Sequence, residues 1–524
     1  MSTESTGAQA GTGTGATPSH APGATAHPTA RGADIPTQDA PSHGTPGNRG
    51  FARVMGTFDT LLFGFGAMIG FGWITLTGGW LDSAGTWGAV GAFVAGGVVM
   101  VLVGLVYSEL VSAMPHAGGE HNYLLRALGP KASVIGSWAI AGGYITVVLF
   151  EAVAAPRTLG YMFDGFAELL PMYSVAGFEV GFLWAISGSV IAAIVTWVNI
   201  RGVKVASLVQ TFVVSFLLLV GLLLVLGIVV GAEPANAQPA FTGGAAGFVV
   251  VLGAVPFLFV GFDVIPQAAE ELKIAPKKIG QVLIWSVVMA VAFYIVVILA
   301  SAYGLPAEAR VDENGNTVLV TADALAHLFG AGFWKQVVLA GGLAGIITSW
   351  VAFMAGSSRL LWAMANSGMI PAWFGKLDPK YRTPKNALLF IGGLAVIAPF
   401  GGTAVLGWVV DGGSPMIVLA YAMVAVGFLV LRRKEPTMER PFVAGGMGVG
   451  GTVIGILATV LCVVMFFLYI PAITPISITL GWQSYLIFGI WMIAGLAFAA
   501  RLPAVPAGPH AERQLLEALS LRRK

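Results

Sequence analysis

The sequence predicts an all-α membrane protein with about twelve transmembrane helices, two of them broken near the middle of the bilayer. Three observations predict this. The chain is 56% hydrophobic and only 10% charged, with a mean hydropathy of +0.84, whereas a soluble domain has roughly 25% charged residues. Apolar runs of about 20 residues, the length that crosses a bilayer, recur along the chain. Two of these runs contain glycines well inside them, and the second also contains prolines and an aspartate.

The apolar runs predict the spans in chain order. We expect them at about 58–80, 86–111, 133–162, 182–199, 206–231, 247–268, 280–304, 335–366, 387–400, 403–431, 447–471 and 482–500. The chain then divides into a tail at 1–52, a transmembrane domain at 53–502 and a short tail at 503–524. The first tail is rich in Gly, Thr, Ala and Pro and has no apolar core. We expect it to be a disordered cytoplasmic segment and not a signal peptide.

Basic residues predict the orientation. Of the 27 lysines and arginines, only Arg157, Arg310 and Lys335 fall at the outer ends of the predicted spans. Cytoplasmic loops carry such an excess of positive charge, so both termini are expected in the cytoplasm. The net charge of +2 reflects this topology, and no basic stripe interleaved with aromatic residues suggests nucleic acid binding. The single cysteine, Cys462, lies in an apolar span and excludes an internal disulfide or a cysteine-based metal site.

The first span is interrupted within Gly64 to Trp73, GFGAMIGFGW. Unwound backbone in hydrocarbon is tolerated where it lines a cavity or binds something, because its polar groups are otherwise unpaired. A break at 69–72 exposes N–H groups that can hold a carboxylate. It also frees the carbonyls of Ala67 and Met68 to accept from an ammonium group. The alternative is that two glycines four residues apart form only a packing seam.

The sixth span contains a second break, within Val255 to Pro266, VPFLFVGFDVIP. The outer half-helix is expected to end near Phe259 and present its carbonyls there, while the phenylalanines cover a bound solute or fill the core. Asp263 follows the break glycine, Gly261. An acid at this depth costs about 2.5 kcal/mol or more and is by default functional, although it could also cap the inner half-helix. Two matched breaks point to a solute site near the membrane midplane.

Other charged residues leave alternatives open. Glu151, in the third span, could meet an amine, relay protons, or pair with Arg157 or another buried charge. Near the inner ends of spans lie Glu109, Glu270, Glu271 and Arg359. These four form either a cytoplasmic gate of ion pairs or solvated helix ends.

Four motifs stand in order along the chain. They are GAMIGFGW in the first span, YSELVSAMPHAGGEHNYLLRALG at Tyr107 to Gly129, GFDVIPQAAEELKIAPKKIG at Gly261 to Gly280, and SRLLWAMANSGMIPAWFGKLDPKYRTP at Ser358 to Pro384. In these motifs the chain resembles the amino acid–polyamine–organocation (APC) permeases over about its first ten spans. The resemblance implies a five-plus-five inverted repeat with two broken helices, two extra helices, and alternating access.

Carried onto this chain, the resemblance places the substrate between the two breaks. The implied binding residues are Met68, Ile69, Gly70, Gly72, Phe257, Phe259, Gly261 and Asp263. In some relatives the carboxylate after the sixth-span glycine serves gating or proton sensing, so Asp263, together with Glu151, is a candidate for coupling. Several relatives have a fifth-span lysine whose ammonium replaces a sodium ion, but Val209 to Gly221 reads VQTFVVSFLLLVG, with no lysine. Ser357 and Ser358 could instead join first-span carbonyls around sodium.

The expected function is that of a secondary transporter moving an amino acid or related small amine across the plasma membrane. A polyamine or ethanolamine permease or exchanger is the alternative, because the two intramembrane acids could accept a cation. An enzyme would need a nucleophile–base pair or metal ligands, and the predicted spans contain no histidine. A channel would need a continuous polar pore, whereas the two breaks predict a single site. We expect no cofactor or metal beyond a coupling proton or sodium ion, and as partners the substrate and the lipid bilayer; the oligomeric state stays open.

Overall fold

The computed structural model describes residues 53–163, 165–166, 169–311, 318–471, 478 and 480–523, without the side chains of 203–209 and 522–523. The predicted tail at 1–52 lies outside the described residues. The domain boundaries therefore stay a prediction.

The predicted spans are confirmed. In the described ranges, eleven helices are long and apolar enough to cross a membrane, and the shorter apolar helix Lys385–Gly401 completes the twelve. In chain order the spans are α1 with α2 (Thr57–Met68, Gly72–Thr75), α3 (Thr77–Ala113), α5 (Pro130–Met162), α6 (Phe182–Arg201), α7 (Val203–Gly231), α8 with α9 (Gly244–Phe259, Val264–Gln267), α10 (Pro276–Gly304), α12 (Phe333–Asn366), α13 (Lys385–Ile397), α14 (Ala404–Lys434), α15 (Val449–Leu468) and α16 (Trp482–Arg501).

A bend inside α3 divides the first span from the second. Gly85 adopts φ 73° and ψ 175°, a conformation that is open to glycine and strained for other residues. A side chain would also meet the backbone of Phe241 at 2.8 Å. Residues before Gly85 therefore continue the first span beyond its break, and those after it form the second.

Each of the first four spans packs against its counterpart five spans later. The second span, α3, packs against the seventh, α10; the third, α5, against the eighth, α12; and the fourth, α6, against the ninth, α13. The first span likewise meets the sixth through α1 and α9. Because five is odd, counterparts run in opposite directions. This pairing is what a two-fold axis in the membrane plane produces, and it agrees with the predicted five-plus-five inverted repeat. Of the two extra helices, α15 packs on α14 and α3, and α16 packs on α14 and α5.

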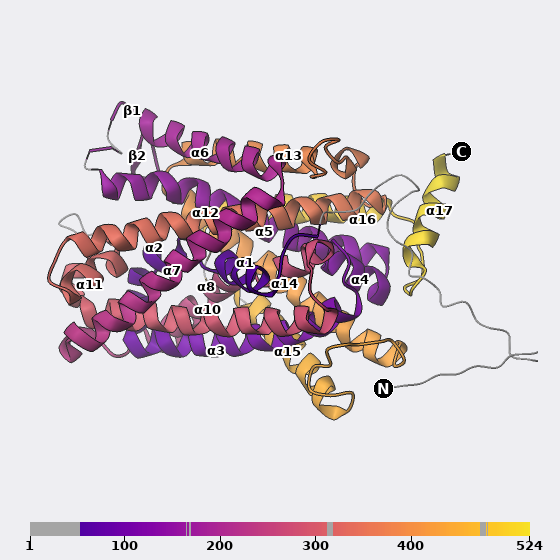
Figure 1. Cartoon of the computed structure of the whole chain (residues 1–524), viewed down its shortest axis with the longest axis horizontal. Helices are drawn as coiled ribbons and strands as arrows, with labels where there is room; N and C mark the ends of the chain where they lie inside the picture. Colours follow the sequence, from indigo (N-terminus) through magenta and orange to yellow (C-terminus); the bar gives the residue numbers. More distant parts are fainter. Residues whose placement is uncertain are drawn as a thin grey trace, which may run out of the picture. The chain divides into compact units, whose positions relative to one another are not determined.

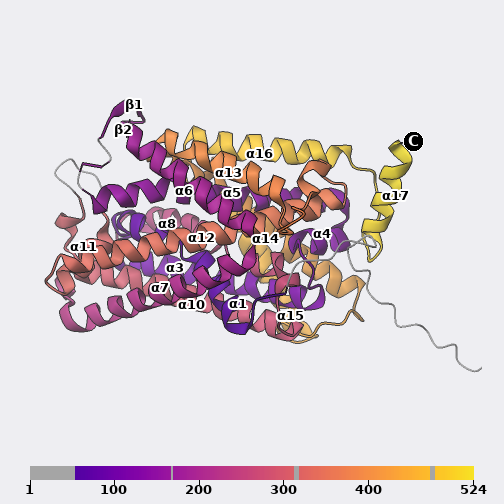
Figure 2. The same ribbon diagram turned by 45° about the horizontal axis from the view of Figure 1, so that its top comes forward.

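Short elements cover the two ends of this bundle (Figures 1 and 2). A hairpin of β1 (Pro171–Val175) and β2 (Phe178–Gly181), together with α11 (Val320–Leu328), lies at one end. At the other end lie α4 (Glu120–Leu128) and α17 (Ala511–Arg523). The remaining turns of 3₁₀ helix are η1 (Pro234–Ala237), η2 (Ala269–Glu271), η3 (Ala307–Arg310), η4 (Ala372–Gly375) and η5 (Ala398–Gly401).

Apolar side chains cover the outside of the bundle as well as its core. Exposed examples on α7, α15 and α16 are Phe212, Val229, Val453, Ile490 and Ile493. Soluble proteins rarely expose large contiguous apolar patches, so these helix faces suit contact with lipid. The chain is a multi-pass membrane protein.

Candidate functional site

Both predicted breaks are present, and they touch each other. The first lies between the end of α1 at Met68 and the start of α2 at Gly72, and the second between the end of α8 at Phe259 and the start of α9 at Val264. Gly261, in the second break, has φ 133°. A Cβ added there would lie 2.9 Å from the carbonyl carbon of Ala67. The second break therefore lies in backbone contact with the last two residues of α1, at the point where the first break begins with Ile69 and Gly70.

A tyrosine that the sequence did not single out joins the two breaks. Tyr294 lies on α10 with 1% of its surface exposed. Its hydroxyl lies 3.0 Å from the carbonyl oxygen of Met68 and 3.3 Å from that of Leu258. One hydroxyl proton is shared between two acceptors, so the two carbonyls lie close enough to be reached by a single donor. The rings of Phe93 and Phe259, each 5.2 Å away between centroids, hold the phenol in place.

Tyr294→Phe should weaken substrate binding without unfolding the protein. The change removes one hydroxyl, and a net hydrogen bond contributes about 1 kcal/mol, which corresponds to roughly a fivefold rise in the KM for uptake. The aromatic packing is kept, so the melting temperature should change little. Tyr173→Phe is the control, because its hydroxyl also donates to a backbone carbonyl, that of Phe400 at 2.8 Å, but at an exposed position away from the breaks. Equal KM values for both variants would contradict a role for Tyr294 at the breaks.

Helix α12 supplies a hydroxyl to the last turn of α1, just before the first break, but from a different turn of α12 than predicted. Thr348 Oγ1 donates to the carbonyl oxygens of Gly66 and Gly345, at 3.2 and 3.0 Å. Ser357 and Ser358, the predicted pair, instead donate to carbonyls of their own helix, at Phe353 and Ala355. The structure therefore does not bring Ser357 and Ser358 to the first-span carbonyls.

Glu151 lies against the first break. Its side chain is 1% exposed, and a Cβ added to Gly70 would overlap its Oε1. The groups beside the carboxyl are neutral, the hydroxyl of Ser349 and the N–H of Phe71. Oε2 has no hydrogen-bond partner. In the described part of the chain, the ion pair with Arg157 that the sequence left open is not formed.

Asp263 ties the second break together. The side chain is fully buried; Oδ1 accepts from the N–H of Gly261 at 2.8 Å, and Oδ2 accepts from the hydroxyl of Tyr421 at 3.2 Å. Although Asp263 stands at the N-cap of α9, it caps no N–H of that helix. Its bonds fix the unwound loop against α14, which carries Tyr421.

The two phenylalanines predicted to cover the substrate face different helices. Phe257 packs edge-on against Phe150 of α5, with ring centroids 5.5 Å apart. It also lies beside α14, because a Cβ on Gly413 would be 3.5 Å from its ring. Phe259 packs against Phe93 of α3 and Tyr294 of α10. Phe257 therefore lines the side of the second break toward α5 and α14, and Phe259 supports Tyr294 from behind.

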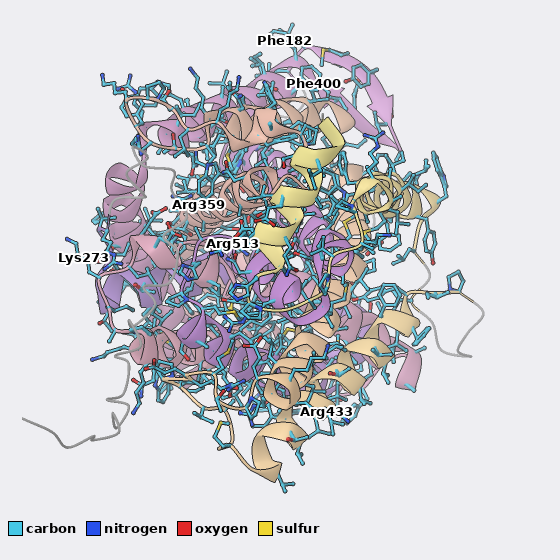
Figure 3. All side chains as sticks on the ribbon, turned by 90° about the vertical axis from the view of Figure 1, so that its right-hand side faces the viewer. Phe182, Lys273, Arg359, Phe400, Arg433 and Arg513 are labelled. Atoms are coloured by element: carbon cyan, nitrogen blue, oxygen red, sulfur yellow. The ribbon has the colours of Figure 1, made fainter. Side chains whose placement is uncertain are left out.

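Backbone pairing and a buried ion pair close the end of the bundle that carries α4 and α17. The N–H groups of Val54 and Met55 donate to the carbonyl of Glu271 at 2.8 and 3.2 Å, and the N–H of Lys273 donates to Met55 at 2.8 Å. The Glu271 side chain pairs with Arg359 of α12. Burial raises the pKa of the Glu271 carboxyl, and the neighbouring Arg359 opposes that rise. Figure 3 looks onto this end, with Arg359 and Lys273 labelled.

A second buried ion cluster lies near the same end. Glu109 is 1% exposed and pairs with Arg432 and with Arg440, the latter at 3.0 Å. Burial lowers the pKa of Arg440, an effect that Glu109 opposes. Glu270 is half-buried and accepts from the N–H of Ala117 at 3.2 Å. These residues are paired and not solvated helix ends, which favours the gate interpretation.

Comparison with known proteins identifies the family. Residues 55–496 match the amino acid permease family. The chain is 28% identical over 459 residues to the branched-chain amino acid permease BcaP of Bacillus subtilis, covering 86% of this chain and 93% of the relative. It is 25% identical, with the same coverage, to the methylthioribose transporter of that organism. It is also 24% identical over 413 residues to its aspartate-proton symporter, covering 76% of this chain and 77% of the relative.

Proposed function

Since this chain belongs to the amino acid permease family of APC transporters, we propose that it carries a neutral α-amino acid across the plasma membrane, with both termini in the cytoplasm. Membership makes it a transporter that works by alternating access, and not an enzyme. The observation that carries the proposal is the contact between the two breaks, where one hydroxyl reaches the carbonyls of both Met68 and Leu258. A carbonyl oxygen has two lone pairs, so an ammonium group beside this hydroxyl would find the same two acceptors.

The backbone of the breaks can hold both ends of an amino acid. The carboxylate would bind main-chain N–H groups where the outer half of the first span begins, at Gly70 and Gly72, because the first N–H groups of a helix have no partner within it. The ammonium group would donate to the carbonyls of Met68 and Leu258. Ile69 and Gly261 complete the binding backbone, and the glycines allow close approach.

The surroundings favour a neutral side chain. Beyond the backbone groups, the wall toward α5 and α14 is formed by Phe150, Phe257 and Gly413. Asp263 is already occupied by Gly261 and Tyr421, so we assign it to gating and not to a cationic substrate. The similarity to a branched-chain amino acid permease points the same way. A polyamine or ethanolamine would have to use the unpartnered oxygen of Glu151.

We assign coupling to a proton, taken up by Glu151. A buried acid without a cationic partner is expensive in a membrane, and the groups around Glu151 are neutral. A proton removes the charge without needing a cavity. The similarity to an aspartate-proton symporter supports this assignment. Ser357 and Ser358 have no part in it, because both hydroxyls bond within α12.

Uptake by purified protein in liposomes tests the proposal. The substrates are L-leucine, L-valine, L-aspartate, L-lysine, putrescine and ethanolamine, each offered with an inward proton gradient, an inward sodium gradient or none. We expect saturable uptake of leucine and valine that rises with the proton gradient. Uptake confined to putrescine and ethanolamine would replace the proposal by the amine alternative.

Phe257→Leu should change which amino acids are transported. Losing the ring next to Phe150 widens the wall beside the substrate side chain, so the KM for leucine should rise at least threefold relative to that for alanine. Phe259→Leu, two residues along the same helix, is the matched control, because its ring packs behind Tyr294. It should leave the leucine-to-alanine ratio unchanged. The measurement is the KM for each amino acid in competition assays; an equal shift in both variants would contradict the assigned wall.

A further inference from the structure

Helix α4 reaches the second break through a buried acid. Glu120, the first residue of α4, is fully buried. Its Oε2 accepts from the side-chain amide of Gln267, the last residue of α9, which is fully buried as well. A Cβ added to Gly119 would lie 2.9 Å from that amide nitrogen and 3.1 Å from the Cβ of Pro266. The start of α4 therefore packs on the short helix that follows the second break, and a side-chain bond joins the two helices.

Phenol groups and one other acid lie around the Glu120 carboxyl. They come from α3, α4, α5, α14 and the second break, and are Tyr107, Tyr123, Tyr144, Tyr421 and Asp263. The titratable groups on the remaining neighbours are bonded elsewhere. They are Arg126 with Glu435, Glu271 with Arg359 of α12, Glu270 with the N–H of Ala117, and His121 and Glu512 of α17 with Ser367. In the described part of the chain, no ion pair includes Glu120.

Two acceptor atoms of the joined side chains lack a donor. Glu120 Oε1 and Gln267 Oε1 make no hydrogen bond, and they belong to the two groups that the existing bond joins. A proton on Glu120 Oε1 would be a donor that the amide oxygen can accept. Turning the amide over would bring its oxygen to the carboxyl, where it again needs a proton. Of the two forms of Glu120, only the neutral one bonds both ends of the amide.

Asp263 favours the same form of Glu120. Its two oxygens already accept from Gly261 and Tyr421, which suits an ionised carboxylate. A second ionised acid in this buried cluster would meet like charge without a cation, so one of the two acids holds a proton. Burial, and then the charge of Asp263, raise the pKa of the Glu120 carboxyl well above its ordinary value, although hydrogen bonds from its own N–H, Tyr107 and Gln267 oppose the rise.

We propose that Glu120 binds a proton from the cytoplasm and in its neutral form holds α9 against α4, so that this end of the transporter opens only when the proton leaves. Helix α9 can separate from α4 only by breaking the bond between Gln267 and Glu120. Water would then reach the carboxyl, which ionises once it is no longer buried. The inference rests on the proposed function, which places α4 and α17 on the cytoplasmic side.

This proton is distinct from the one assigned to Glu151. It returns to Glu120 from the cytoplasm when the end closes, so it is not carried across the membrane. Glu120 touches α9 and not the substrate, so it is a positioning residue for the second break. A proton needs no cavity, and the packed surroundings of Glu120 therefore suit it.

The direction of the pH effect follows from the two forms of this end. In the closed form the pKa of Glu120 is raised, whereas in the open form water returns it toward its ordinary value of 4.5. The proton stabilises the closed form fully below that ordinary value, and this stabilisation is lost as the pH rises through the raised pKa. Between the two values, each pH unit favours the open form by up to about tenfold. A higher cytoplasmic pH should therefore speed turnover.

Exchange in right-side-out membrane vesicles tests this effect. The vesicles are loaded at an internal pH of about 6 or about 8 with the external pH fixed, and the labelled solute is any amino acid that the protein takes up. We expect Vmax of the unaltered protein to rise at least about threefold with internal pH. Glu120→Gln, whose amide pairs with Gln267 without a proton, should keep its melting temperature and show the low Vmax at both pH values. Glu435→Gln removes another carboxylate bonded to α4 and, as the control, should keep the pH response.

Infrared difference spectroscopy detects the proton itself and needs no substrate. In spectra of the purified unaltered protein minus Glu120→Gln at neutral pH, we expect the C=O band of one protonated carboxyl. The difference against Glu435→Gln should lack this band. If the band is present and no amino acid is taken up, the proton site stands and the proposed function fails.

Three results would overturn the inference. They are absence of the band in the Glu120→Gln difference, failure of Glu120→Gln to fold, and an unchanged pH response of exchange in this variant. The first two would show that Glu120 is ionised, and the third that its proton does not control opening. A response to external instead of internal pH would contradict the proposed orientation and, with it, the cytoplasmic origin of the proton.

Discussion

Gly261→Ala is expected to abolish amino acid uptake while the protein still reaches the membrane. Gly261 has φ 133°, where a residue with a side chain is strained by about 1–3 kcal/mol. Its Cβ would also come within 2.9 Å of the Ala67 carbonyl carbon and the Met68 nitrogen. Backbone atoms cannot swing aside as a side chain can. The two breaks would have to separate, and the carbonyls of Met68 and Leu258 would no longer share one donor.

The measurement is leucine uptake in liposomes, normalised to the amount of folded protein recovered by size exclusion. Gly407→Ala serves as the matched control, since a Cβ there meets no atom within 4 Å. Gly72→Val gives an independent test, because its Cβ crowds the flexible end of Leu258, at 2.6 Å, and meets Leu76 at an ordinary 3.7 Å, so folding should be preserved. It should still abolish uptake by occupying the space of the substrate carboxylate. Normal uptake by a well-folded Gly72→Val would show that the first break is only a packing device.

The membrane fold could be predicted almost entirely from the sequence, because the lipid bilayer restricts which sequences can cross it. Lipid requires about 20 apolar residues per span and tolerates unwound backbone only in protected places, so composition alone marks both spans and breaks. Outside the lipid this constraint disappears. The loop helix α4, enclosed between Gly119 and Gly129 with φ of 38° and 90°, and the hairpin at 171–181 were not predicted. Helix α17, in the predicted C-terminal tail, packs on α4 and α5 with Leu515 fully buried.

The site could be predicted only where residues break their own helix. Glycines and an aspartate destabilise a membrane-spanning helix, so their presence in an apolar span indicates the breaks. A tyrosine or threonine in an apolar span has no such cost and gives no indication. Tyr294, Thr348 and Tyr421 therefore gave no signal. Whether these side chains reach the breaks depends on how far one helix is shifted along its neighbour. The residues of a single helix do not determine that shift. Ser357 and Thr348 illustrate the size of the effect, since nine residues at 1.5 Å each place them about 13.5 Å apart along α12.

Asp263 shows why a costly residue reveals a site but not its own role. The sequence allowed a proton switch, an ammonium partner or a helix cap. The structure gives the carboxylate a neighbouring N–H and a tyrosine hydroxyl from α14, so its two oxygens hold the loop of the second break to another helix. An acid with satisfied oxygens suits gating, whereas Glu151, with an unpartnered oxygen, is better placed to take up a proton.

Glu151→Gln is accordingly expected to abolish proton-driven accumulation and to spare exchange. The amide keeps the shape of the side chain beside Gly70 and Ser349, but it cannot gain and lose a proton during the cycle. Accumulation of leucine against its gradient, driven by an inward proton gradient, should fall at least tenfold. Exchange of internal for external leucine, which needs no net proton movement, should stay within about threefold of the unaltered protein.

Two outcomes would contradict this role. If exchange and accumulation fall together, Glu151 serves substrate binding or folding, because loss of proton coupling alone would leave exchange intact. If accumulation driven by the proton gradient persists, another group carries the proton, and Asp263→Asn becomes the next variant to measure. Glu233→Gln, at an exposed position beyond the end of α7, controls for the loss of one carboxylate and should leave both activities unchanged. A proton acceptor beside the first break requires that Glu151→Gln lowers accumulation and spares exchange. Glu233→Gln must leave both activities unchanged.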